Sequence, residues 1–345
     1  MMKLTSPLWI TILLLPFVSL SAKENNKAIS GVYYAEKMMS SPHFQASGIA
    51  WWNDQLIIAT RNAKQLKTFT PPDQFGVLKE DAFPVGVAVD PKGNLLYTEK
   101  SKGLNRLIRQ AKDGNTEILL DDPGDGSKRV SKTGIGSPHF VAAHPNGTIY
   151  WSGFPDGGTR YLLPGAKEVT VASPYIIHTH GMGLSPKHDW LYVNTKTPNK
   201  EQRGVWRFPV NKDGSLGKGK FFIAINDFTT SHLKNLPPAK DGSDKLLGWV
   251  GRLQGLTVDR LGYIYVSGSE SHSSGTAVAV FTPDGKKLAA MIVPEPGVSM
   301  GLPTNICGLA FGGKDGRTLF ITGSGNYRLY QVKLPVAGEV VTRRR

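Results

Sequence analysis

The sequence predicts an all-β protein, specifically a six-bladed β-propeller of four-stranded antiparallel blades. One observation behind this prediction is a short phrase that occurs six times in the 345 residues. It begins with a variable residue, the next residue is usually a glycine, and an apolar run follows. A second observation is that each copy is followed by a turn and another apolar run, while helical periodicity is almost absent. Repeats of about 40 to 50 residues are typical of propeller blades. A closed ring of such sheets leaves only short, protected edges.

The expected strands follow the chain in a regular order. The first strands of the six units begin at Ser47, Val85, His139, His180, Gln254 and Cys307. The second strands begin after a turn, at Leu56, Leu95, Ile149, Leu191, Ile264 and Leu319. Further strands are expected near residues 118–120, 160–163, 204–208, 277–281 and 327–332. The early run at residues 31–35 is expected to complete the last sheet and so to close the ring.

One gap between phrases is longer than the others and predicts an insertion. Residues 226–249, which include His232 and two consecutive prolines, are expected to form a long loop over one face. Loops of this length inside a compact domain are usually functional lids or binding loops. Plain surface decoration is the alternative for this segment.

The first 22 residues have the pattern of a secretory signal peptide. Lys3 supplies a positive start, residues 4–20 are mostly apolar, and Ser19, Ser21 and Ala22 offer a small-residue cleavage site. The apolar stretch contains two prolines and is short for a membrane span, which needs about 20 apolar residues. We therefore expect residues 23–345 to form a single secreted or periplasmic domain without a membrane span.

Charge and cysteine usage narrow the possible partners. The net charge is +14, but the lysines and arginines are scattered through turns, so binding to nucleic acid is not expected. Cys307 is the single cysteine, so the chain cannot form an intrachain disulfide. The fold must therefore be stabilised by burial of apolar surface, without a disulfide. The oligomeric state cannot be predicted from the sequence.

The candidate site is formed by the residues that open the six phrases, called here the first-position residues: Ser47, Val85, His139, His180, Gln254 and Cys307. In a propeller the innermost strand of each blade lines a central channel. Residues at equivalent strand starts therefore meet at one mouth of that channel. Two imidazoles, a thiol, an amide and a hydroxyl on one axis indicate a functional site.

Three interpretations of this site are open. In the first, His139, His180 and Cys307 bind a divalent metal, and these ligands suit Zn²⁺ or copper better than Ca²⁺. In the second, no metal is involved: one histidine is a general base, and the other groups bind the substrate or include a thiolate nucleophile at Cys307. In the third, the channel holds a satisfied polar network with water and no chemistry. We predict the metal ligands of the first interpretation, with His178, Gln254 and Ser47 as catalytic residues.

Several segments resemble the gluconolactonase and senescence-marker-protein (regucalcin) family. The resemblance runs from about residue 45 to residue 335, in segments 86–97, 137–140, 181–186, 206–210 and, most specifically, 310–322. It implies a six-bladed propeller with one divalent cation in the channel. It also implies hydrolysis of sugar lactones and related esters, in which the metal polarises the carbonyl group and an activated water attacks it.

The resemblance fails at the cation ligands. Where the family has a Glu, two Asn and an Asp, this chain has Ser47, His139, His180 and Gln254. Each change removes oxygen-donor character or negative charge. The sequence therefore predicts a hydrolase or lyase acting on a small sugar-derived lactone or ester. The alternative is a propeller that has lost lactonase activity and binds a ligand or partner.

Overall fold

The computed structural model describes residues 28–40, 46–101, 103–122, 135–153, 158–173, 176, 179–195, 203–239, 242–269, 277–295, 305–323 and 328–339. The predicted signal peptide and His178 lie outside these residues. Nearly all regular structure in the described chain is β-strand, which confirms the all-β prediction. The helical segments described are a 3₁₀ turn at Ile225–Asp227 and one α-helical turn, α1, at Leu247–Val250. Within the described part of the chain, no helix is long and apolar enough to cross a membrane.

Four antiparallel sheets have four strands each, in the order of the chain. Two of them are β2 (Ile49–Trp52), β3 (Gln55–Thr60), β4 (Gln65–Thr70) and β5 (Gln74–Lys79), and β6 (Pro84–Val89), β7 (Leu95–Ser101), β8 (Leu104–Gln110) and β9 (Thr116–Asp122). The other two are β10 (Pro138–Ala143), β11 (Ile149–Gly153), β12 (Thr159–Leu162) and β13 (Thr170–Val171), and β14 (Thr179–Leu184), β15 (Trp190–Thr195), β16 (Gly204–Pro209) and β17 (Lys220–Ala224).

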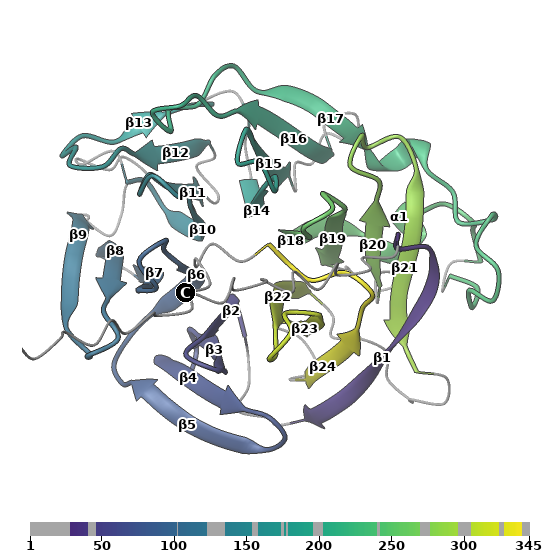
Figure 1. Cartoon of the computed structure of the whole chain (residues 1–345), viewed down its shortest axis with the longest axis horizontal. Helices are drawn as coiled ribbons and strands as arrows, with labels where there is room; N and C mark the ends of the chain where they lie inside the picture. The colour runs from purple at the N-terminus through teal and green to yellow at the C-terminus, as the bar shows by residue number, and fades with distance from the viewer. Residues whose placement is uncertain are drawn as a thin grey trace, which may run out of the picture.

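The fifth sheet has eight strands and contains both the beginning and the end of the described chain. Its order is β18 (Arg252–Val258), β19 (Ile264–Ser269), β20 (Val278–Phe281), β21 (Leu288–Pro294), β1 (Gly31–Ser40), β24 (Arg328–Lys333), β23 (Thr318–Gly323) and β22 (Ile306–Gly312). Figure 1 shows the sheets arranged radially, with β2, β6, β10, β14, β18 and β22 innermost. This arrangement is a β-propeller. The predicted number of six blades stays a prediction, because it depends on counting the eight-stranded sheet as two.

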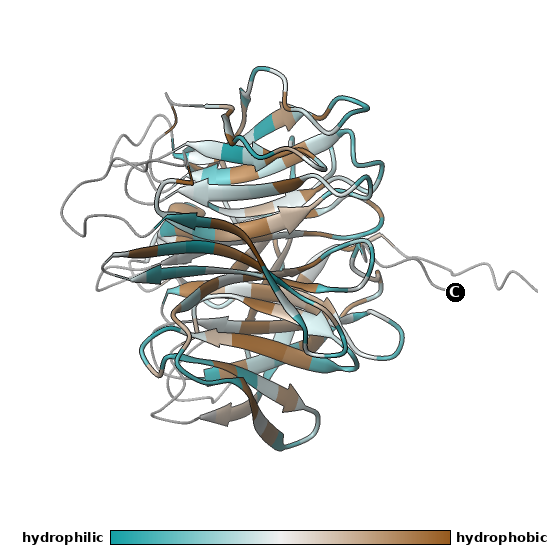
Figure 2. Ribbon diagram, turned by 90° about the vertical axis from the view of Figure 1, so that its left-hand side faces the viewer, coloured by the Kyte–Doolittle hydropathy of each residue, from teal (hydrophilic) through white to brown (hydrophobic). Residues whose placement is uncertain are grey.

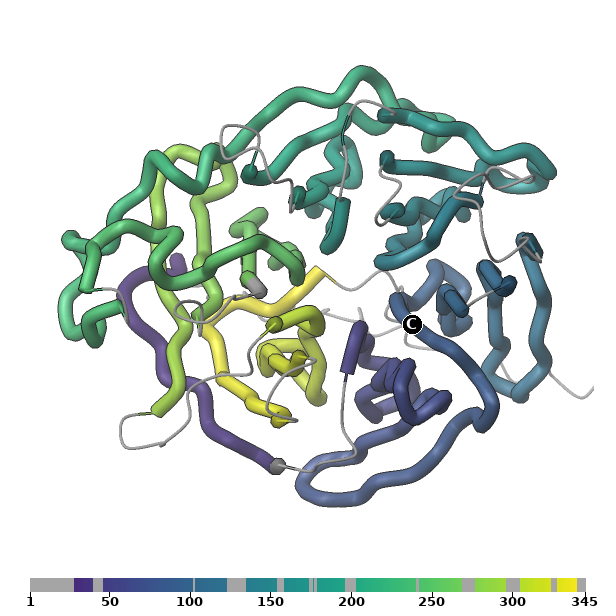
Figure 3. Tube along the Cα trace, turned by 180° about the vertical axis from the view of Figure 1, so that it is seen from behind, coloured from purple at the N-terminus to yellow at the C-terminus, as the bar shows by residue number. Residues whose placement is uncertain are grey.

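Strand β1 joins the two halves of that sheet and corrects one prediction. Its residues Gly31 to Ala35 pair in parallel with β21, whereas Glu36 to Ser40 pair antiparallel with β24. The half of the sheet formed by β22, β23 and β24 is therefore extended by residues 36–40, whereas the predicted residues 31–35 extend the half formed by β18 to β21. Seen from behind, β1 runs along the rim past β21 and β24 (Figure 3). A single strand thus covers two sheet edges that would otherwise be open.

The core lies between neighbouring sheets, because each sheet has two apolar faces. Ile57 and Ala59 of β3, for example, pack with Val87 of β6 and Tyr97 of β7. Figure 2 shows hydrophobic residues along the strands and hydrophilic residues in many of the turns that join them. The fully buried Trp151 keeps its polar atom bonded, because its Nε1 donates to the Ile135 carbonyl at 2.9 Å.

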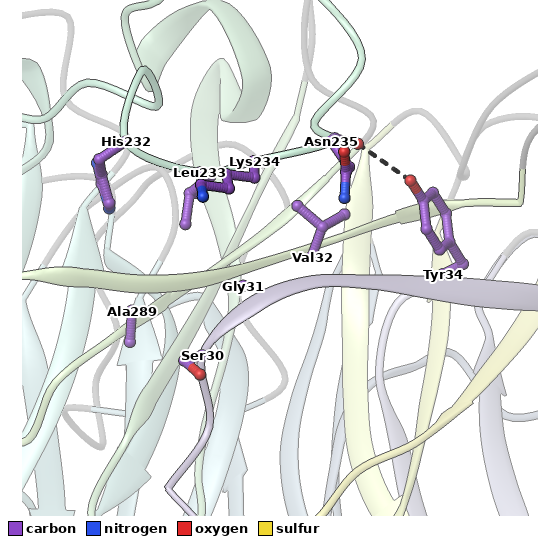
Figure 4. Close-up of a pocket in the computed structure, with 9 residues that line it drawn as sticks. All are labelled: Ser30, Gly31, Val32, Tyr34, His232, Leu233, Lys234, Asn235 and Ala289. Atoms are coloured by element: carbon purple, nitrogen blue, oxygen red, sulfur yellow. Dashed lines mark hydrogen bonds between the residues drawn. The ribbon is translucent and has the colours of Figure 1, made fainter.

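The inserted segment packs on the rim of the eight-stranded sheet. Leu233 and Leu246 belong to the same hydrophobic cluster as Met291 of β21. The Tyr34 hydroxyl of β1 donates to the Asn235 carbonyl at 3.0 Å, across a cleft of about 690 Å³ between β1 and the insertion (Figure 4). The middle of the insertion therefore lies against outer strands rather than over the inner ones.

Asp259, at the end of β18, gives a prediction about stability and pH. The carboxylate is fully buried and accepts hydrogen bonds from the Leu261 and Tyr263 amides and from the Tyr265 hydroxyl. Burial nevertheless raises its pKa from 3.8 to about 6. Because the folded pKa exceeds the unfolded one, the protonated form stabilises the fold. That stability is fully present below about pH 4 and is lost as pH rises through about 6.

An Asp259→Asn variant isolates this effect, because asparagine is neutral at every pH. The free energy of unfolding of the wild type, minus that of the variant, is expected to fall by roughly 3 kcal/mol between about pH 3.5 and pH 8. Denaturant titrations of both proteins at several pH values measure the difference. A difference that is flat would show that folding leaves the pKa of Asp259 unchanged, and a difference that rises with pH would show that the fold stabilises the charged carboxylate.

Candidate functional site

Local backbone geometry places the first-position residues. In five of the inner strands the ladder register shifts at the phrase start, between Pro84 and Val87, Pro138 and Val141, Thr179 and Met182, Leu253 and Leu256, and Ile306 and Gly308. A bulge of this kind bends a strand and re-aims its side chains. The first-position residues of these strands therefore leave the regular alternation of the sheet.

The glycine in the second position of the phrase allows neighbouring inner strands to approach closely. A Cβ on Gly86 would lie 2.2 Å from the His139 carbonyl oxygen, and one on Gly181 would lie 2.4 Å from the Gln254 carbonyl oxygen. Real Cβ atoms do not come this close to backbone oxygens, so only glycine fits. The third copy has Phe140 in this position instead.

Buried polar side chains of the second strands fix this backbone. Thr98 Oγ1 accepts from the Gly86 amide at 2.9 Å and donates to the His139 carbonyl at 2.6 Å. Asn194 Nδ2 donates to the carbonyls of Gln254 and Gly255. These bonds join one inner strand to the next, so the first-position residues are held on a rigid frame.

The structure brings His139 and His180 together, as the sequence predicts for adjacent inner strands. Their ring centroids are 4.8 Å apart with 74° between the planes, and the Phe140 ring lies 5.0 Å from that of His139. His139 is half-buried, whereas His180 is only 2% exposed and both of its ring nitrogens are buried. His139 is therefore the imidazole of this pair that a substrate can reach.

Gln254 and Cys307 form a second pair. The single S–H of Cys307 is shared between two acceptors, Gln254 Oε1 at 2.9 Å and the Asn305 carbonyl at 3.1 Å from Sγ. A thiolate would lose both bonds, so this environment favours the neutral thiol over a nucleophile. No described hydrogen bond uses the Nε2 donors of Gln254, which leaves them available to a bound molecule.

The predicted metal trio does not form within the described residues. There, no three His, Cys, Asp or Glu side chains are grouped closely enough to hold a metal ion. His139 and His180 lie together, but the Cys307 thiol is committed to Gln254 and to a backbone carbonyl. The first-position residues also supply no carboxylate. They do not fit the divalent cation that the family implies.

Ser47 and Val85 complete the first-position residues. The described hydrogen bond of Ser47 comes from its backbone amide, which donates to the Ala59 carbonyl at 2.8 Å. Val85 is buried and contributes no polar group. The structure thus does not place Ser47 in a catalytic contact, and its predicted role stays untested, as does that of His178.

A cavity of about 570 Å³ occupies the interior of the ring, beyond the first-position residues. Its walls are later residues of the inner strands, including Trp51, Val87, Met182 and Phe311, with Lys314 among the turn residues at the far end. None of the first-position residues lines it. The first-position residues and this cavity are therefore separate.

Sequence reasoning missed Arg203, the residue before β16. It is only 8% exposed, although arginine is rarely buried without a partner. It stands outside the repeated phrase, and no local pattern marks it. Only the three-dimensional arrangement shows that it lies near Arg252, which precedes Gln254 by two residues on β18.

The fold and the site define a β-propeller whose polar side chains gather where the inner strands begin. The chain belongs to the family described as SMP-30/Gluconolactonase/LRE-like region, whose model matches residues 45–325. This match confirms the family resemblance that the sequence segments predict.

Individual relatives are distant. The 6-deoxy-6-sulfogluconolactonase of Pseudomonas putida is 24% identical over 221 residues, which are 61% of this chain and 63% of that protein. A gluconolactonase structure from Xanthomonas campestris has a TM-score of 0.62 at 20% identity, covering 87% of this chain and 89% of its own. The calcium-binding protein regucalcin from Agrobacterium tumefaciens has a TM-score of 0.63 at 15% identity, covering 90% and 97%. At these identities the two structures establish a shared fold only.

Proposed function

We propose that the protein hydrolyses a sugar-derived lactone or ester at the first-position residues. The observation that carries this proposal is the half-buried His139, whose ring lies 4.8 Å from that of His180 at the start of two adjacent inner strands. Membership of a lactonase family supports the type of reaction. The small polar substrate is inferred from the same membership.

His139 acts as the general base in this proposal. Its neutral imidazole takes a proton from water while the water oxygen attacks the carbonyl carbon of the lactone. The ring C–O bond then breaks, and the imidazolium returns its proton to the departing alkoxide, which leaves a hydroxy acid. A positioned base of this kind contributes about 10² to 10⁴ in rate.

Two further residues support the reaction from fixed positions. Gln254 Oε1 is occupied by the Cys307 thiol, so its Nε2 donors can bind the oxygen on which negative charge develops. His180 packs edge-to-face against His139 and is a positioning residue, because its nitrogens are buried. Cys307 orients the Gln254 amide and takes no part as a nucleophile.

Removal of metal tests this assignment against the predicted metal mechanism. After dialysis against a chelator, the rate of lactone hydrolysis is expected to stay unchanged, because the proposed step uses only His139 and Gln254. Acid release from gluconolactone by treated and untreated protein measures this. A rate that is lost and then restored by added Zn²⁺ or Ca²⁺ would contradict the metal-free step.

The number of blades and the cellular location of the protein are also inferred. We infer six blades, because six inner strands carry the phrase and β1 joins a group of four strands, β18 to β21, to a group of three, β22 to β24, and pairs with both groups. Export to the periplasm or the exterior is inferred from the signal-peptide pattern of residues 1–22.

A further inference from the structure

Arg203 is a buried cation without a described partner. Arg203 is only 8% exposed, and its Nε atom is buried without a hydrogen bond. No ion pair joins Arg203 to any described carboxylate. Burial, with a smaller contribution from Arg252, lowers the pKa of the Arg203 guanidinium.

A buried guanidinium without an opposite charge destabilises the protein when no ligand is bound. A buried charge loses its hydration and is normally compensated by an opposite charge and hydrogen bonds. Here the neighbouring charge that acts on Arg203 is another arginine, which makes the energy of the unliganded protein worse. An anion bound between the two guanidinium groups would reverse both unfavourable contributions.

Chain connectivity places the two arginines beside the proposed active site. Arg203 immediately precedes β16, the third strand of the sheet whose inner strand carries His180. With strands about 4.8 Å apart, its backbone lies roughly 10 Å from that of β14. Arg252 opens β18, the inner strand that carries Gln254 two residues later. A substituted sugar held at His139 and Gln254 could therefore extend to both arginines.

We propose that Arg203 and Arg252 bind an oxyanion substituent of the substrate, so that the protein selects acidic sugar lactones over neutral ones. Two planar guanidinium groups suit the oxygens of a carboxylate, a sulfonate or a phosphate. This inference rests on the proposed function for the identity of the substrate, but the anion site can be measured without catalysis.

The test compares two lactones and one non-reacting anion. Gluconolactone is neutral, glucarolactone carries a carboxylate, and glucarate is the open-chain dianion. The wild type is expected to have a kcat/KM at least about tenfold higher for glucarolactone, and Arg203→Met and Arg252→Gln are each expected to reduce that preference by about tenfold. Calorimetry should show glucarate binding to the wild type and weakened binding to both variants.

Arg207→Met is the matched control, because Arg207 lies on β16, the strand that Arg203 immediately precedes, but has partners. Its guanidinium stacks over Trp190 and Phe222 at 4.5 and 4.2 Å from the ring centroids. This control should lower the Tm and leave the preference for glucarolactone unchanged. Arg203→Met should keep or raise the Tm, since it removes an uncompensated charge. A fall in Tm like that of the control would mean that Arg203 is structural and would overturn the inference.

The remaining outcomes separate the anion site from the reaction. Equal kcat/KM for both lactones, or glucarate binding that neither variant weakens, rejects the anion site and leaves lactone hydrolysis standing. Binding of glucarate through both arginines without turnover of either lactone supports the anion site and rejects the proposed function. A sulfonated lactone that is preferred over glucarolactone would still support the site and would identify sulfonate as its anion.

Discussion

Replacing His139 by alanine is expected to lower kcat for lactone hydrolysis by about 10² to 10⁴, with a smaller change in KM. The reason is that His139 is the half-buried imidazole of the pair, whereas the neighbouring His180 is buried. A His139→Gln variant keeps a polar side chain but cannot accept the proton, so it should be equally inactive. Steady-state rates of acid release measure both variants.

His144→Ala provides the control for this experiment. His144 is also half-buried and lies just past the far end of the same strand, β10, where its Nδ1 accepts from the Asn146 amide at 3.2 Å. Its removal should leave kcat unchanged. If His139→Ala were as active as His144→Ala, the general-base role of His139 would be wrong.

Gly86→Ala is expected to destabilise the protein by roughly 3 kcal/mol or more. The added Cβ would meet the His139 carbonyl oxygen at 2.2 Å and the Phe140 Cα at 2.8 Å, and both are backbone atoms that cannot rotate away. The variant should also disturb the Thr98 bridge between the two inner strands. Denaturant unfolding measures the loss.

Gly165→Ala separates packing from backbone strain. Gly165 has a φ of +75° in a surface turn, and a Cβ there would meet nothing within 4 Å. Only the conformational strain of a positive φ remains, about 1 kcal/mol. An equal loss for both variants would mean that the inner strands can separate to accommodate a side chain.

Much of the fold could be predicted from the sequence because the phrase carries two physical requirements at once. Its apolar run forms an inner strand, and its glycine allows the next strand to approach, as Gly86 and Gly181 show. The pairing of His139 with His180 followed from the same regularity, since residues at equivalent strand starts face one axis. The division of β1 between β21 and β24 could not be predicted, because residues 31–40 form one continuous strand and nothing in its sequence marks the change of partner.

The composition of the site was less predictable, because it depends on bonds between side chains distant in sequence. His139 and His180 offer imidazoles and Cys307 offers a thiol, and these ligand types alone favour Zn²⁺ or copper. The structure instead uses the Cys307 thiol to hold Gln254, 53 residues away. Arg203 could not be found at all, because a single arginine outside the repeat has no distinguishing pattern until its burial is known.

The most direct test of the central claim is the rate at which the purified wild-type protein releases acid from a sugar lactone, compared with buffer and with His139→Ala under identical conditions. We expect hydrolysis well above the buffer rate for the wild type and a rate close to that of buffer for the variant. A wild-type protein that does not accelerate either gluconolactone or glucarolactone, or a His139→Ala variant with full activity, would contradict the account.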